Sequence, residues 1–199
     1  MGCLKNIIKT VILIFAVIGF ISVGGPDFFV KKWNEFMQPS KEVIMEKAQK
    51  VGDFSQISDE FEIDKAASML GYNGVLAEHK ASGQKMIVVN SGKKYLLTKK
   101  DFDNNNIEEK LETLRKKFKY SVINVEDLKI TKKGYIKAFE QNSPYVKFKA
   151  KINNIPSGNV EGIISAVETK NGDSKIIISI NEDGKYSQLI AQEFFRKVK

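Results

Sequence analysis

The sequence predicts an α+β protein with an N-terminal membrane-spanning helix and an extracytoplasmic body of antiparallel β-meanders packed with amphipathic helices. Three observations lead to this fold class. A long apolar run occupies the N-terminus, several short segments alternate apolar and polar residues, and two later segments repeat apolar residues at helical spacing. Helices segregated from antiparallel strands are typical of α+β domains.

The N-terminal run carries no charge between Lys9 and Asp27. As a helix, residues 7–25 would rise about 28 Å, close to the roughly 30 Å hydrocarbon core of a bilayer. The sequence Gly24-Gly25-Pro26 then ends the helix. We therefore predict that residues 1–25 form a membrane anchor, which contacts the lipid bilayer through residues 7–25.

A juxtamembrane collar follows at residues 26–39. Its apolar residues recur at helical spacing, and it contains the single tryptophan of the chain. Aromatic side chains prefer the interface between lipid and water. The residues predicted to lie at the membrane interface are Phe28, Phe29, Trp33, Phe36 and Met37.

A cleaved signal peptide is the alternative to an anchor. The basic start, the short apolar region and the small residues Ser22 and Gly24 fit cleavage after Gly24, which would release a secreted enzyme or inhibitor. The aromatic collar and the apolar residues just before this position favour the anchor. Lys5 and Lys9 precede the uncharged run that begins at Thr10, so we expect the N-terminus in the cytoplasm and the body outside it.

Composition restricts the chemistry of the body. The only cysteine, Cys3, precedes the anchor, so the body has neither a disulfide nor a thiol nucleophile. The net charge is +8, and 32 residues are lysine or arginine. Almost all of these are lysine, without the arginines and interleaved aromatics that nucleic-acid recognition prefers, so we expect no nucleic-acid partner. The lysines could contact anionic lipid or wall polymer, but their large excess over arginine indicates compositional bias and favours a solvated surface.

The first part of the body, residues 40–103, is predicted as a helical and three-stranded subdomain. Ser40 can cap a helix from Lys41 to Val51, and Asp64 can cap a short helix over 65–70 that ends at Gly71. Pairs of serine and glycine separate three predicted strands, at Val75–Ala81, Lys85–Val89 and Lys94–Thr98.

The second part, residues 104–199, begins with the clearest helix of the body, capped by Asn106. Its apolar residues lie at i, i+4, i+7 and i+11: Ile107, Leu111, Leu114 and Phe118. We expect this stripe to pack on the strand face that carries Val146, Phe148 and Ile152.

Five strands and a C-terminal helix follow, and the two parts of the body can form one domain. The strands are predicted at Val122–Thr131, Tyr135–Phe139, Tyr145–Ile152, Val160–Thr169 and Lys175–Ile180. The helix is predicted at Tyr186–Val198, with Leu189, Ile190, Phe194 and Phe195 on its apolar side.

The sequence contains no recognisable catalytic constellation and no cofactor motif. Its single histidine, His79, lies on a predicted strand with lysine and glutamate beside it, where an exposed position is expected. One histidine and no cysteine in the body are too few ligands for zinc. The chemistry therefore favours a binding or accessory module for an unknown protein or envelope component over an enzyme.

One segment resembles a calcium-binding loop. Oxygen ligands occur at positions 1, 3, 5 and 12 of the pattern, at Asp101, Asp103, Asn105 and Glu112. The glycine of position 6 is replaced by Asn106, and the apolar residue of position 8 by Glu108. These departures favour helix capping by Asp103 or Asn106 as the role of the segment.

Overall fold

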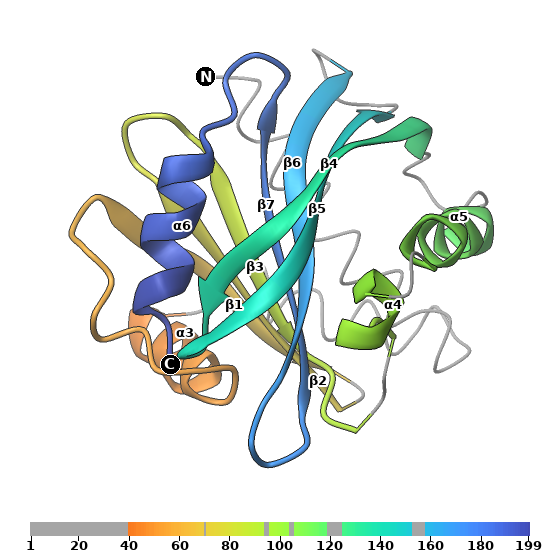
Figure 1. The fold of residues 1–199 in the computed structure, drawn as a ribbon. Coiled ribbons are helices and arrows are strands. Elements are labelled where there is room, and N and C mark those ends of the chain that lie inside the picture. Colours follow the sequence, from red (N-terminus) through yellow and green to blue (C-terminus); the bar gives the residue numbers. More distant parts are fainter. Residues whose placement is uncertain (1–39, 70, 94–95, 104–105, 119–124, 153–157) are drawn as a thin grey trace, which may run out of the picture.

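Alternating apolar residues place most of the body in strands. A computed structural model describes residues 40–69, 71–93, 96–103, 106–118, 125–152 and 158–199. Within these ranges seven antiparallel strands form one sheet of order β1-β2-β3-β7-β6-β5-β4 (Figure 1). They are β1 Phe61–Met69, β2 Tyr72–His79, β3 Lys85–Asn90, β4 Val125–Ala138, β5 Gln141–Ile152, β6 Asn159–Glu168 and β7 Ser174–Glu182.

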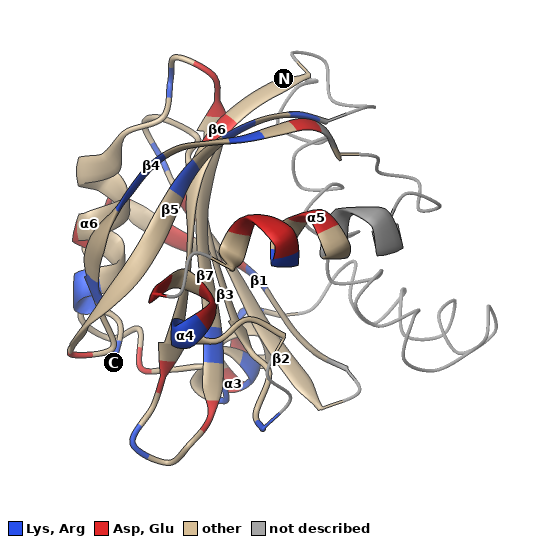
Figure 2. Ribbon diagram, turned by 45° about the vertical axis from the view of Figure 1, so that its right-hand side comes forward, with Lys and Arg blue, Asp and Glu red and all other residues tan. Residues whose placement is uncertain are grey.

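Helices cover both faces of the sheet. Helices α3 (Lys41–Gln49) and α6 (Gln188–Lys197) pack on one face, and α4 (Lys99–Asp103) and α5 (Ile107–Phe118) lie on the other (Figure 2). The α+β class is therefore confirmed for the body. The predicted anchor and the aromatic collar lie outside the described residues, and no helix within the described ranges is long and apolar enough to cross a membrane.

Two meanders make up the sheet, and the pairing of β3 with β7 joins them. Three consecutive pairs of this ladder are apolar on both strands: Ile87 with Ile178, Val88 with Ile177, and Val89 with Ile176. Successive side chains point to opposite faces, so each strand contributes to two cores. Val88 and Ile177 belong to the α3–α6 core, whereas Ile87 and Ile176 belong to the α4–α5 core. Both predicted subdomains thus supply strands to one sheet.

The described part of the segment predicted as a helix over 65–70, residues 65–69, belongs to strand β1. Ala66 is buried in this strand, and β1 pairs with β2 from Phe61 opposite His79 to Met69 opposite Tyr72. Local helix propensity is overridden here by pairing with β2. Gly71 has φ 79° and makes the tight turn between the two strands, so the same glycine signal marks a strand turn instead of a helix end.

Two other strand predictions are corrected. The described residues of the segment Lys94–Thr98 are not in a strand but lead into α4, and β1 replaces this segment as the third strand of the first meander. Strand β4 runs unbroken through Lys133-Gly134, where a break was predicted. Gly134 lies under the ring of Tyr145, and a Cβ at this position would approach the ring to 2.8 Å.

The hairpin between β4 and β5 turns at Phe139 and Glu140, which have φ 49° and 62°. Both residues adopt the left-handed conformation that hairpin turns require, but neither is the glycine or asparagine that usually adopts it. The sequence therefore gave no turn signal at this position.

The helix stripes are confirmed in part. Ile107 and Leu111 are buried with Val146 on one side of the sheet, as expected, whereas the side chains of Leu114, Phe118 and Ile152 lie outside the described part. Ser40 caps α3, because its Oγ accepts a hydrogen bond from the backbone N–H of Val43 at 3.4 Å.

Helix α6 packs through Ala191, Phe194 and Phe195, whereas Leu189 is 75% exposed, contrary to its predicted apolar role. Leu189 lies two residues before Ala191, and two residues rotate the helix by about 200°, so it faces away from the sheet.

The C-terminal residue is held beside the end of α3. The backbone N–H of Asp53 donates to the carbonyl of Lys199 at 2.7 Å, and the N–H of Lys199 donates to the carbonyl of Asp53 at 3.0 Å. Gly52 allows this approach, since a Cβ there would lie 2.8 Å from the carbonyl oxygen of Lys199. The first and last described segments of the body are thus joined by two backbone hydrogen bonds.

Two substitutions on α6 test this packing. We expect Phe194→Ala to lower the free energy of unfolding by about 3–5 kcal/mol, because it leaves a cavity among Phe54, Phe61 and Phe195. Leu189→Ala, on the solvent side of the same helix, is expected to change it by less than about 0.5 kcal/mol. Chemical denaturation measures both values, and similar losses for the two variants would contradict the assigned face.

Candidate functional site

The four predicted calcium ligands do not gather around one point among the described residues. Asp101 lies in α4, where its Oδ2 accepts hydrogen bonds from the backbone N–H and the hydroxyl of Thr98 at 2.7 and 2.8 Å. Its Oδ1 lies 3.6 Å from the ammonium of Lys110. Burial raises the pKa of Asp101, but the hydrogen bonds from Thr98 and the charge of Lys110 outweigh it and hold the pKa below its usual range. This carboxylate therefore caps α4.

The other candidate ligands point elsewhere. Asp103 is exposed at the end of α4, Asn105 lies outside the described residues, and Glu112 lines a pocket against β4. No three histidine, cysteine, aspartate or glutamate side chains in the described ranges are placed to hold a metal ion. A calcium site in this segment stays a prediction.

His79 is buried, contrary to the expected exposed position. It is 8% exposed at the end of β2, and its ring meets Phe61 edge-on with 5.2 Å between centroids. The backbone N–H of Ser82 donates to Nδ1 at 3.2 Å, and the hydroxyl of Ser82 lies 2.9 Å from the same atom. Nδ1 therefore accepts hydrogen bonds within the β2–β3 turn, and His79 serves to hold this turn.

Lys85 is a second buried polar side chain that sequence patterning missed. Its side chain is 0% exposed, and its ammonium makes a short salt bridge with Glu78 on the neighbouring strand. A buried ammonium without a partner would cost several kcal/mol, and Glu78 offsets this cost. The alternation of β3 places Lys85 on the same face as Ile87, where an apolar residue was the simpler expectation.

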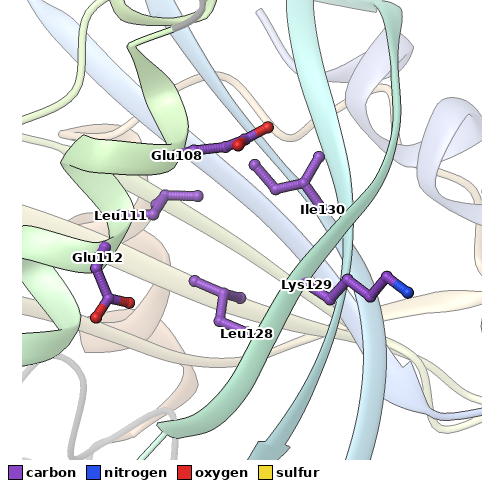
Figure 3. A pocket seen from close by; sticks show the side chains of 6 residues that line it. All are labelled: Glu108, Leu111, Glu112, Leu128, Lys129 and Ile130. Carbon is purple, nitrogen blue, oxygen red and sulfur yellow. The ribbon is translucent and has the colours of Figure 1, made fainter.

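The hollow between α5 and β4 is the candidate ligand site. It is a pocket of about 360 Å³ lined by three residues of each element, Glu108, Leu111, Glu112, Leu128, Lys129 and Ile130. Figure 3 shows Leu111 and Leu128 facing each other across the gap. The side chains of Glu108 and Glu112 extend from α5 along the same gap, and the Lys129 side chain points away from α5.

The apolar part of this pocket continues into the core. Leu111 is buried, and Leu128 and Ile130 are half-buried against the α4–α5 core. Above them, Glu108 is exposed, with its Oε1 3.9 Å from the ammonium of Lys133. The pocket thus combines an apolar floor with two carboxylates, an arrangement that can bind an apolar group carrying a positive charge.

The sequence singled out two lining residues for other reasons. Leu111 was predicted as part of the helix stripe, and Glu112 as a calcium ligand. Leu128 and Ile130 were missed, because bulges between Glu126 and Lys129 and between Ile130 and Lys132 shift the register of β4. Asp127 within the first bulge has φ 49°. Simple alternation cannot assign faces across such shifts.

Lys175 is a buried lysine whose pKa is strongly shifted. It is 8% exposed at the start of β7, and its ammonium lies 3.8 Å from the ring centroid of Phe139. Burial lowers the pKa of Lys175 to about 8, partly offset by the charge of Asp173. A neutral lysine amine is a nucleophile, but this one is covered by an aromatic ring, so we assign it a structural role.

Comparison with known proteins finds no family model that matches the chain and no curated protein that matches it.

The pKa of Lys175 gives a stability prediction. Its folded-state pKa of about 8 lies below the unfolded value of about 10.4, so below pH 8 the folded state carries the full cost of a buried charge. Between pH 8 and 10.4 the folded state loses this proton first, and the cost disappears. We expect Lys175→Met to be more stable than the unmodified protein at pH 7 by about 1–2 kcal/mol, with the difference vanishing near pH 10.5.

Urea unfolding of both proteins at several pH values measures this difference. Lys170→Met is the matched control, because Lys170 is exposed in the turn before β7 and is expected to give no pH-dependent difference. An advantage of Lys175→Met that stayed constant from pH 7 to 10.5 would contradict the assigned burial cost.

Proposed function

We propose that this protein is a membrane-tethered binding module whose ligand site is the pocket between α5 and β4. The observation that carries this proposal is the apolar floor of Leu111, Leu128 and Ile130 beneath the carboxylates of Glu108 and Glu112. None of the six lining residues is a serine, cysteine or histidine nucleophile. The pocket therefore supports binding better than covalent catalysis.

The chemistry of the lining defines the ligand class. A volume of about 360 Å³ is at the lower end of the usual range for ligand pockets, so the site suits a small molecule or one or two side chains of a peptide. The apolar floor favours an aliphatic or aromatic body. The carboxylates favour an ammonium or guanidinium group beside it. We propose an amphipathic cation, such as an apolar peptide segment that bears lysine or arginine.

The tether is proposed from the sequence. Residues 7–25 are mostly apolar, with Lys9 and Thr10 near their start, and are long enough to approach the thickness of a bilayer, and the aromatic collar has the composition of an interface segment. The basic residues before the span favour a cytoplasmic N-terminus, which would place the pocket outside the cytoplasm. A module in this position would bind its ligand at the membrane surface.

Two probes with the same apolar chain test the pocket. We expect hexyltrimethylammonium to shift the methyl NMR signals of Leu111, Leu128 and Ile130 in the full chain, held in neutral nanodiscs. Hexyl sulfate, with the opposite charge, is expected to leave them unchanged at the same concentration. Glu108→Gln and Glu112→Gln should each weaken binding of the cation by about two- to fivefold, the size of one exposed charge interaction of about 0.5–1 kcal/mol.

Glu109→Gln is the matched control for these variants, because Glu109 is exposed on the same helix but does not line the pocket. This variant is expected to bind hexyltrimethylammonium as tightly as the unmodified protein does. Equal shifts with both probes, or an equal loss in the Glu109 variant, would contradict a site that recognises a cation.

The tether has a separate test that uses the single cysteine. The intact mass of the native protein is expected to include residues 1–24, and a chain that begins at Gly25 would overturn the anchor. A membrane-impermeant maleimide is expected to label Cys3 only after permeabilisation. In a Cys3→Ser background, Gln56→Cys on the exposed surface of the body should be labelled in intact spheroplasts. The reverse pattern would invert the topology.

A further inference from the structure

Strand β4 forms one edge of the sheet and carries a row of exposed basic side chains. Strand β5 is its neighbour in the sheet, and no strand of the described residues pairs with its outer side. Figure 2 shows basic segments along β4 and β5. The exposed residues between the second bulge and the β4–β5 turn are Lys132, Lys133, Tyr135 and Lys137, which we call the Lys–Tyr edge.

The register of β4 and β5 gives this edge its arrangement. Lys133, Tyr135 and Lys137 lie at alternate positions, opposite Val146, Pro144 and Asn142, so their side chains share one face of the strand. Ile136 lies between Tyr135 and Lys137, Ala138 follows Lys137, and both are buried on the other face. An aromatic ring thus lies between two lysines, on a strand held in place by its opposite face.

One lysine of the edge is compensated, because the ammonium of Lys133 lies 3.9 Å from Oε1 of Glu108. Within the described part of the chain, no carboxylate pairs with Lys132 or Lys137. The three residues of β5 opposite Lys133, Tyr135 and Lys137 are all uncharged. The neighbouring lysines of β5 differ in this respect, because Lys147 pairs with Glu161 and Lys149 with Asp183. A separate positive surface therefore remains on β4.

Lysines on an edge strand also prevent sheets from pairing edge to edge, and this role alone could explain Lys132 and Lys137. It does not explain Tyr135, which is 66% exposed and is one of the most exposed large apolar side chains in the described structure. A phenol ring with one apolar and one polar end suits the boundary between water and lipid headgroups. Lysines beside such a ring suit a negatively charged surface.

We propose that the Lys–Tyr edge lies against the anionic headgroups of the bilayer to which the chain is tethered. Each lysine near such a surface contributes about 1 kcal/mol, so Lys132, Lys137 and a tyrosine bind weakly alone but are effective once a tether holds them close. The inference rests on the proposed tether for this proximity.

The length of the collar allows this orientation. Helix α3, which follows the collar, packs on β1 and β2 at the opposite edge of the sheet from β4. Seven strands span about 29 Å at 4.8 Å per neighbour. This orientation requires residues 26–39 to extend past the sheet, over as much as about 46 Å at 3.3 Å per residue, in place of the interfacial position expected from their composition.

Tryptophan quenching by brominated lipid tests the contact. The full chain with Trp33→Phe and Tyr135→Trp is placed in vesicles of phosphatidylcholine, with or without phosphatidylglycerol, brominated near the headgroup end of the acyl chains. We expect at least a twofold loss of tryptophan emission in vesicles containing phosphatidylglycerol and little loss in phosphatidylcholine alone. High salt is expected to restore the emission.

Two matched variants complete the design. Leu189→Trp, in the same Trp33→Phe background, places the probe on the exposed side of α6 and is expected to stay unquenched. Adding Lys132→Gln and Lys137→Gln to the Tyr135→Trp chain is expected to abolish most of the quenching. Equal quenching at positions 135 and 189, or quenching that needs neither phosphatidylglycerol nor the two lysines, would overturn the proposed anionic contact.

Flotation of the same vesicles separates this inference from the tether. A chain that floats with the vesicles but shows no quenching at position 135 retains its anchor and contradicts the Lys–Tyr edge. A chain that fails to float with any vesicle contradicts the tether. Quenching at position 135 without stable flotation would show that the edge binds anionic lipid by itself.

Discussion

The pairing of β3 with β7 is the constraint on which the rest of this structure depends. It joins the meander of β1, β2 and β3 to the meander of β4, β5, β6 and β7, and so creates one sheet with two continuous faces. The isoleucine and valine pairs of this ladder belong alternately to the two cores. Both helix layers therefore pack on surfaces to which both halves of the chain contribute. Since the two strands are far apart in the sequence, this pairing must overcome a large loss of chain entropy before either core is complete.

Much of the fold could be predicted where local pattern and tertiary contact agree. The alternation around Val146, the stripe of Ile107 and Leu111, and the Ser40 cap are features of this kind, because each depends on neighbours in the sequence. The segment 65–70 could not be predicted in the same way. Its alanines suit a helix locally, and only the hydrogen bonds to β2 make residues 65–69 a strand. The turn at Phe139 and Glu140 was also hidden, because its left-handed residues carry no glycine or asparagine signal.

The candidate site was less accessible to sequence reasoning than the fold. Leu111 could be recognised as apolar and facing the sheet. The spacing of the apolar residues in α5 does not show, however, that a pocket remains between Leu111 and β4. Glu112 was noticed for its distance in the sequence from Asp101, whereas in the structure Asp101 caps α4 and Glu112 faces β4. The positions of Leu128 and Ile130 depend on two bulges, which arise from pairing with β5. A pocket between two elements depends on the distance between them, and the periodicity of either element does not encode this distance.

The hydrogen bonds between Asp53 and Lys199 have a mechanical consequence. Any pull on the chain before residue 40 enters the body through α3, and the segment after this helix is clamped to the final residue by two backbone hydrogen bonds. The buried side chains of Ile44, Ala48 and Val51 lie behind the same clamp. Tension would therefore load α3 and this small clamp before it reached the long ladders of the sheet. The first element to detach under force would be α3, while the strands that carry the pocket and the Lys–Tyr edge kept their register.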